Sequence, residues 1–323
     1  MQIKSHQNCK IWLSILVITA MVAVEELLGD KEVIFPEMAA LTIGAWIADK
    51  QPWNVSKPRI LAVMTISSLI GWSISSLLEI PLFFKLIIGL VLCIILLLVS
   101  QTTMLPLMSA TILPILIGAK SIVYPLSVII LTVLIVLLQL LLEKYGFRSQ
   151  STYIKIKYHW PIEFSRWLLI ITVFALTALI VLPLDLPFII APPLIVAFCE
   201  FSYFDSLVRK SPMVLWLLIA ACTVIGTSVR YILCLHFGLP LYAAAFLITV
   251  IVLYSMSLLK KLFPPAGALA ILHLIIDEKA LLWYPLEVMT GAALLITISM
   301  LYGIISKKIL HNIKQEANDE ILL

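Results

Sequence analysis

Apolar residues follow one another along this chain in runs that alternate with short polar loops. A helix needs roughly 20 residues to cross a bilayer core of about 30 Å. Several runs reach that length, and others are conspicuously short. The pattern predicts an all-α, polytopic membrane protein. We expect crossings at 11–28, 33–48, 59–79, 81–100, 103–118, 121–142, 166–183, 188–204, 213–235, 239–259, 262–276 and 283–306.

Prolines, glycines and aromatic residues recur in the second half of the chain in the order of the first half. Chance gives one or two coincidences of this kind, but a collinear series indicates an internal repeat. We therefore predict two tandem six-helix repeats with short, proline-interrupted helices, over 1–145 and 166–308, joined by a cytoplasmic linker at 146–165 and followed by a cytoplasmic tail at 309–323. The matching pairs, at offsets of 155 to 160, are Trp12 and Trp167, Pro36 and Pro192, Gly71 and Gly226, Pro81 and Pro240, Pro106 and Pro265, and Tyr124-Pro125-Leu126 and Tyr284-Pro285-Leu286.

Composition supports a membrane protein and excludes several functions. With 62% hydrophobic residues, 12% charged residues and a mean hydropathy of +1.12, the chain has more apolar surface than a soluble domain can bury. The net charge of +4 does not indicate nucleic-acid binding, because the basic residues lie in short loops between apolar runs. The five cysteines have no metal-ligand spacing, so we expect no metal, no cofactor and no disulfide.

Lysines and arginines give the orientation, because short cytoplasmic loops are enriched in them. With twelve crossings, most of the 22 basic residues lie on one side, and both termini are cytoplasmic. Each half then has an even number of crossings, so the two repeats are parallel and their axis lies along the membrane normal. If the four short runs were re-entrant hairpins, most of this bias would vanish. We expect a multi-pass protein of the plasma membrane.

The linker is rich in aromatic and basic residues, among them Tyr153, Lys155 and Trp160. Such a segment suits the headgroup level of the cytoplasmic leaflet. An ordinary solvated loop is an equally good interpretation.

The segment Phe263-Pro264-Pro265-Ala266-Gly267-Ala268, followed by a short apolar run and another span, resembles the HPP family of integral membrane proteins. The signature of that family is His-Pro-Pro-Ala-Gly-Ala, and Phe263 stands in place of its histidine. The basic element of the family is matched by Lys57-Pro58-Arg59 and more weakly by Arg209-Lys210-Ser211-Pro212. The first half keeps only Pro106 of the core motif. The resemblance implies a role in membrane transport, and nitrite transport is attributed to plastid members.

The residues of this segment also have a physical interpretation. Proline suits the first turn of a helix, and glycine permits close approach of a backbone or ligand. A helix that begins at Pro264 and Pro265 should leave free amide donors near Ala266, Gly267 and Ala268, and such a terminus attracts anions.

Three further short runs begin in a comparable way. Pro106 precedes Ser109 and Thr111, while Pro36 and Pro192-Pro193 start helices from the opposite face. Four interrupted helices in two related pairs favour one central solute site. The alternative is that these prolines merely end loops and start helices.

Ionisable residues inside spans are costly, and each is a functional candidate. Arg230 and Glu287 have a similar depth and are candidates to pair, and Glu37 directly follows Pro36. The alternatives for each charged residue are a water-filled cavity or a ligand, which for Arg230 would be an anionic substrate. Glu25, Glu26 and Glu200 fit interfacial positions. His273 fits a hydrogen-bonded packing role better than that of a ligand.

The sequence contains no metalloprotease, serine-hydrolase or nucleotide-binding motif, so we do not expect an enzyme. The favoured interpretation is a secondary transporter or uniporter of a small solute, with small anions as one class. The alternatives are a non-transporting subunit of a larger complex and a small-substrate membrane enzyme. The expected partners are the lipid bilayer and a small or ionic substrate, and a homo-oligomer is compatible with the sequence.

Overall fold

The computed structural model describes residues 2–203 and 206–321, with side chains described from residue 6 to residue 304 outside that gap. All regular structure in these residues is helical. Eight helices are long and apolar enough to cross a membrane, which confirms the all-α, polytopic membrane class. These long helices are α1 (Gln2–Leu28), α3 (Lys57–Leu77), α4 (Leu82–Ser100), α6 (Val123–Lys144), α7 (Trp160–Val181), α9 (Pro212–Arg230, continued by the π-helix η5, Tyr231–His236), α10 (Leu241–Leu258) and α13 (Tyr284–Ile321).

Shorter helices lie between the long ones. Prolines occupy the first turn of four of them and the position just before a fifth, and the sequence predicts all of these starts except that of η3 at Pro187. Before α8 and α11, the residue that precedes the proline, Ala191 or Phe263, has non-helical backbone, as proline favours. The short helices are η1 (Lys31–Val33), α2 (Glu37–Thr42, continued by the π-helix η2, Ile43–Ile47), α5 (Pro106–Ile117), η3 (Pro187–Ile190), α8 (Pro192–Ser202), η4 (Leu207–Lys210), α11 (Pro264–Leu272) and α12 (Glu278–Leu281).

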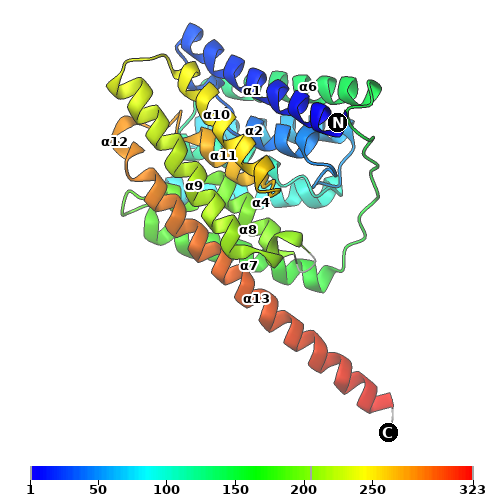
Figure 1. Ribbon diagram of the computed structural model, residues 1–323. Coiled ribbons are helices and arrows are strands. Elements are labelled where there is room, and N and C mark those ends of the chain that lie inside the picture. The colour runs from blue at the N-terminus through cyan, green and yellow to red at the C-terminus, as the bar shows by residue number, and fades with distance from the viewer. Residues whose placement is uncertain (1, 204–205, 322–323) are drawn as a thin grey trace.

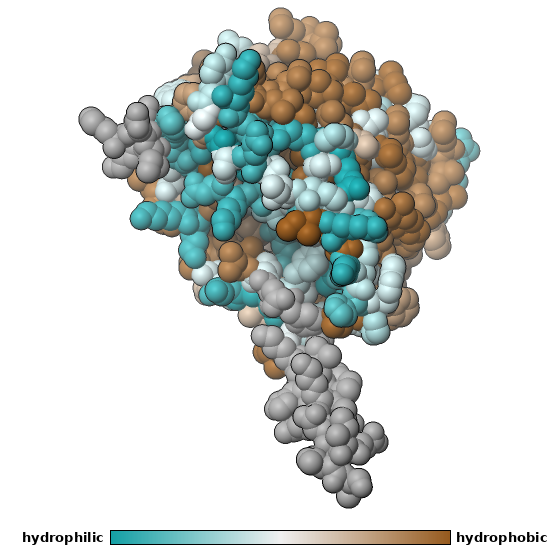
Figure 2. Space-filling model, turned by 90° about the vertical axis from the view of Figure 1, so that its right-hand side faces the viewer, coloured by the Kyte–Doolittle hydropathy of each residue, from teal (hydrophilic) through white to brown (hydrophobic). Residues whose placement is uncertain are grey.

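The long helices run between two faces of the bundle (Figure 1). One face carries the segment between α6 and α7, and we call it the linker face. Here Lys57, at the start of α3, forms a 2.7 Å ion pair with Glu143, at the end of α6. Figure 2 views the molecule from the side of the linker and shows hydrophilic residues gathered in the middle, with apolar residues around them. This distribution fits a bundle whose sides face lipid.

The short helix α5 also runs from one face to the other. Before it, Thr103 accepts a 2.7 Å hydrogen bond from the Asn54 amide on the linker face. After it, the Lys120 carbonyl accepts a bond from Trp72, near the far end of α3, and the Lys120 amide donates to Glu32. The segment therefore does not turn back to the face from which it starts.

The segment of α2 and η2 runs in the opposite direction. It follows η1, which holds Glu32, and it ends on the linker face, where Arg148 donates hydrogen bonds to the carbonyls of Trp46 and Ala48 at 3.0 and 2.7 Å. In the second half, the Phe188 amide of η3 donates to Glu287 at the start of α13. At the end of α8, the Ser202 hydroxyl accepts from Arg166, near the start of α7 and the linker. These segments too connect the two faces rather than re-entering.

The linker is docked on the first half of the chain. Arg59 stacks on the Tyr153 ring at 3.9 Å, and Asn54 exchanges two hydrogen bonds with the backbone of Ile154. Burial lowers the pKa of Arg148, against the opposing charges of Glu143 and Asp49. The linker therefore packs on protein, which neither sequence-based interpretation expected, and α7 begins inside it, at Trp160.

Candidate functional site

The four short helices α2, α5, α8 and α11 meet inside the bundle. α2 packs against α11 and α5, and α8 packs against α5 and α11. Every residue of α2, α11 and the first ten positions of α5 is buried. The convergence expected from the prolines is therefore present in the structure.

Glu37 and Ser109 form the polar centre of this junction. Glu37 begins α2, and its side chain is enclosed at 1% exposure. The Ser109 hydroxyl, on α5, donates a hydrogen bond to Glu37 Oε1. Glu37 Oε2 is buried and has no hydrogen-bond partner in the described part of the chain. The first turns of two helices that run in opposite directions thus meet at a carboxyl group.

The neighbours of Ser109 on α5 have structural contacts. The Thr111 hydroxyl bonds to the carbonyls of Leu107 at 3.1 Å and of Ser67, on α3, at 3.2 Å. Pro106 starts the helix and is buried. Both residues hold α5 against α3, and neither adds a free polar group to the junction.

The start of α11 corrects one expectation. Pro264 and Pro265 occupy its first turn, but the amide of Ala266 donates to the Phe263 carbonyl at 3.1 Å. The first turn is closed by this tighter bond, so the donor expected at Ala266 is not free.

Gly267 faces the first half of the chain. A Cβ atom at this position would overlap the Cδ1 methyl of Ile43 and lie 3.7 Å from Cβ of Ala39. A small apolar void beside it measures about 10 Å³. That volume is about the minimum for one water molecule. The junction at Gly267 is therefore closed in this conformation.

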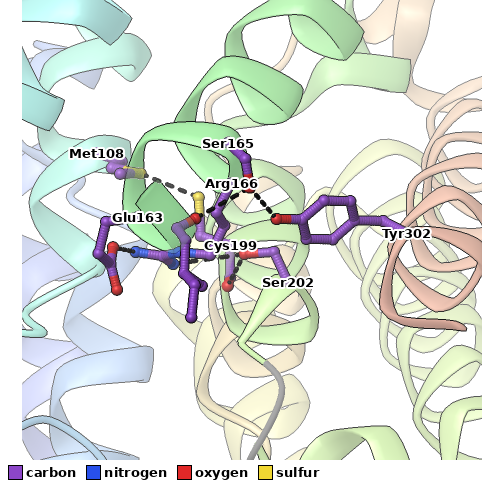
Figure 3. A network of polar contacts seen from close by, with 8 residues as sticks. Met108, Glu163, Ser165, Arg166, Cys199, Ser202 and Tyr302 are labelled. Atoms are coloured by element: carbon purple, nitrogen blue, oxygen red, sulfur yellow. Dashed lines mark hydrogen bonds and ion pairs between the residues drawn. The ribbon is translucent and has the colours of Figure 1, made fainter. Parts of the chain in front are cut away.

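α8 brings a further contact to the junction. Pro192 and Pro193 are buried in its first turn, and Cys199 lies 3.3 Å from the sulfur of Met108 on α5 (Figure 3).

Sequence reasoning missed the role of Arg166, which it assigned to the start of the second repeat. Arg166 is 2% exposed and lies between the rings of Trp167 and Tyr203, at 4.1 and 3.7 Å. It forms a 2.5 Å ion pair with Glu163 (Figure 3). The i, i+3 spacing of Glu163 and Arg166 is the sequence signal that indicates this pair.

The structure contradicts the expected pair of Arg230 and Glu287. Arg230 donates to the carbonyls of His273 and Ile276, the second at 2.8 Å. Glu287 accepts from the Phe188 amide at 2.9 Å. A cation at the end of α11 and an anion at the start of η3 each satisfy backbone groups that a helix end leaves open. Arg230 therefore holds the end of α11, and Glu287 the start of η3, at the face opposite the linker.

His273 follows α11 and is fully buried. Its ring lies against Gly226 of α9, where a Cβ would come within 2.7 Å, and its centroid is 6.5 Å from that of Tyr284. The packing role expected for it agrees with this position, but the hydrogen bond expected with it is not found: both ring nitrogens are buried without a hydrogen-bond partner in the described part of the chain.

Arg230→Met and Glu287→Gln should act independently. The first change leaves the carbonyls of His273 and Ile276 without their donor, at a cost of about 1–3 kcal/mol. The second keeps a carbonyl acceptor for Phe188 and should cost little. Thermal unfolding of the purified single and double variants should give additive losses within about 0.5 kcal/mol.

Lys279→Met, at an exposed position near the same face, is the control for loss of positive charge. A double variant more stable than Arg230→Met alone would show that the two residues do interact.

Comparison of the chain with protein-family models, curated proteins and solved structures finds no match in any of the three. Of the predicted site residues, Glu37, Ser109 and Gly267 lie at contacts between short helices. Pro36, Pro106, Pro192, Pro193, Pro264, Pro265 and Ala266 shape the starts of these helices, and Thr111, Arg230 and Glu287 bind backbone around them.

Proposed function

We propose that this chain is a membrane transporter of a small solute, either a secondary transporter or a uniporter. The observation that carries the proposal is the contact of Glu37 and Ser109 at the junction of α2 and α5, with α11 and α8 beside them. Interrupted helices that meet at a buried polar group form the substrate sites of many transporters. A carboxyl group inside the membrane lowers the stability of the fold, so its presence there indicates a function.

Small anions are the first class to test, because the N-termini of α2 and α5 carry partial positive charges. Their first-turn amides, such as those of Met38 and Met108, already donate to the Phe35 and Leu105 carbonyls, so these ends supply a partial charge but neither a free donor nor a formal counter-charge.

We also propose that the fold is a duplication of six crossings, with the two copies in parallel orientation. Corresponding contacts in the two halves support it. Tyr124 donates to the Ala110 carbonyl of α5 at 3.0 Å, and Tyr284 donates to the Leu269 carbonyl of α11 at 2.7 Å. At the helix level, α2 packs on α11 as α8 packs on α5, and α1 packs on α10 as α7 packs on α4 (Figure 1).

A distant relation to the HPP family remains part of the proposal, and it rests on the motif that ends in Gly267. Phe263, at the position of the family histidine, is 1% exposed and packs edge-on against Phe201 at 6.2 Å. An aromatic residue in the core cannot replace the hydrogen bonds of a histidine. We therefore do not carry the nitrite substrate of plastid members over to this chain.

The linker face is proposed to be cytoplasmic, in the plasma membrane. Single cysteines at Asn54, Ser151 and Ser206, in a background without other cysteines, should react only with reagent on the cytoplasmic side. Asn54 and Ser151 line one polar hollow of about 500 Å³ on the linker face. A cysteine at Glu278 should react only from outside, since the neighbouring Asp277 pairs with Lys31 at the opposite face.

Labelling of whole cells with a membrane-impermeant maleimide makes this measurement, and permeabilised cells give the total. Reaction of Asn54→Cys from outside would reverse the proposed orientation. Reaction of Glu278→Cys and Asn54→Cys from the same side would contradict the span assignment itself.

The purified chain alone, in proteoliposomes, should take up a small solute with saturation. The first probes are nitrite, formate and acetate, with urea as a neutral probe and protein-free liposomes as the control. A thermal-shift screen of the same solutes selects candidates, because a ligand of the native state raises its apparent stability. No uptake of any probe, together with a soluble protein that co-purifies, would favour an accessory subunit. Chemical conversion of a probe without its movement would favour an enzyme.

A further inference from the structure

The charge state of Glu37 follows from what surrounds it. Its carboxyl group is 1% exposed, one oxygen accepts the Ser109 bond, and the other has no hydrogen-bond partner in the described residues. None of the ion pairs found among the described side chains involves Glu37. A carboxylate in this position would be buried without a counter-charge, which is far more costly than a neutral carboxylic acid.

The elements packed against α2 supply no cation that could change this conclusion. α5 and α11 contain no ionisable residue. In α1, the buried Lys10 lies toward the linker face, near Asp49 and Arg148, and Glu25 and Glu26 lie in the last turn. In α6, Glu143 and Lys144 lie at the end on the linker face.

The titratable groups that share an electrostatic environment with Glu37 are the phenols of Tyr124, on α6, and Tyr284, on α13. Both phenols already donate to backbone carbonyls of α5 and α11. The enclosed state is therefore the protonated state, with the proton on the oxygen that Ser109 does not contact.

We propose, on the basis of the proposed transport function, that Glu37 carries one proton across the membrane with each solute molecule. When the junction opens to water on one side, the O–H bond of the carboxyl group breaks and its proton passes to water. When the carboxylate takes a proton from water on the other side, its charge disappears and the junction can close. An anionic solute binds only beside the neutral form, because a carboxylate would repel it. Proton and solute thus move together.

The proton site can be tested without any solute. The carbonyl stretch of a protonated carboxylic acid is separate from the bands of a carboxylate, and infrared spectra of the purified full-length chain in lipid record it as pH is varied. We expect one such band at neutral pH that is lost in Glu37→Gln and retained in Glu79→Gln, a matched change in an exposed loop. A band that is the same in the wild type and in Glu37→Gln would overturn the proposal.

A second variant covers the case in which Glu37→Gln does not fold. Ser109→Ala removes the hydrogen bond to the carboxyl group and should shift the frequency of the same band. Ser67→Ala, another buried serine hydroxyl with a backbone acceptor, should not shift it. An unshifted band in Ser109→Ala would assign the proton to another carboxyl group and overturn the proposal.

Coupling is tested with whichever probe among nitrite, formate and acetate enters the vesicles. The undissociated acids of these probes cross lipid unaided and reach the same equilibrium distribution without any protein, so coupling is measured as the initial rate of uptake above that of protein-free vesicles. An alkaline interior should raise this protein-dependent rate, because each anion enters with one proton. Lightly buffered vesicles should show proton uptake with the same stoichiometry. Glu37→Gln should abolish the proton movement, and Glu79→Gln should not affect it.

The two proposals fail in different ways. Uptake driven by a sodium gradient and indifferent to the pH gradient would overturn proton coupling and leave the transport function in place. No uptake of any probe, with the infrared band of Glu37 present, would overturn the transport function and with it the coupling role.

Discussion

Gly71→Ala is expected to destabilise the folded chain strongly. Gly71 lies on α3, and a Cβ atom there would come within 2.9 Å of the Thr111 carbonyl carbon and closer still to its oxygen. The obstacle is backbone, and α5 is buried over its first ten residues, so it has little room to move away. Overpacking of this kind costs about 1–3 kcal/mol and occasionally more. We expect a large fall in the thermal midpoint of the purified chain and a lower yield of folded protein.

Gly89→Ala is the matched control. Gly89 is also buried in a helix of the first half, but its added Cβ would meet the Cδ1 methyl of Ile115, at 2.6 Å. The tip of a flexible side chain can move, so this change should cost much less. Equal losses of thermal stability for both variants, measured in the same detergent, would show that the α5 backbone can move away from α3 and that their contact is not rigid.

Much of the fold could be predicted because a bilayer imposes few solutions. Apolar runs long enough to span must be helices, and prolines within such runs favour helix starts and ends. The starts of α5, α8 and α11 accordingly lie at Pro106, Pro192 and Pro264. Pro114, inside α5, is followed by only three more helical residues. The recurrence of Tyr-Pro-Leu in the sequence corresponds to hydrogen bonds from Tyr124 and Tyr284 to the preceding short helices.

The pairing of charged residues could not be predicted in this way. Similar depth made Arg230 and Glu287 candidates for each other, but depth is one coordinate of three, and the sequence does not give the rotation of a helix about its axis. Both residues bind backbone groups, which every residue possesses and no sequence pattern marks. The error about the Ala266 amide has a related cause, because a tighter first turn uses a donor that an ideal α-helix leaves free.

The sequence indicates Glu37 and Ser109 as candidate site residues, but their contact could not be predicted from it. Each residue is a candidate because it follows a proline near the start of a short helix, and the two helices are separate in the sequence. Their contact joins positions 72 residues apart and depends on how two helices that run in opposite directions meet. Residue type and proline spacing could indicate the members of the junction, while only the packing shows that they touch.

Gly267→Leu is expected to abolish transport while leaving expression largely intact. Gly267 is where α11, of the second half, approaches α2, of the first half, and the void beside it measures about 10 Å³. A single added methyl would displace only the tip of Ile43, so Gly267→Ala should keep most of the uptake. Leucine places three more carbon atoms between the two helices.

The leucine destabilises the conformations in which α2 and α11 are in contact. A transporter must pass through such a closed state between its two open states, so a penalty of about 3 kcal/mol or more on that state should slow uptake roughly 100-fold or more, to the level of protein-free liposomes. The initial rate of uptake into proteoliposomes, with the amount of monodisperse protein as the measure of folding, separates the two effects. A Gly267→Leu chain that folds and transports at the wild-type rate would place the pathway elsewhere, because a site between α2 and α11 cannot close around a leucine.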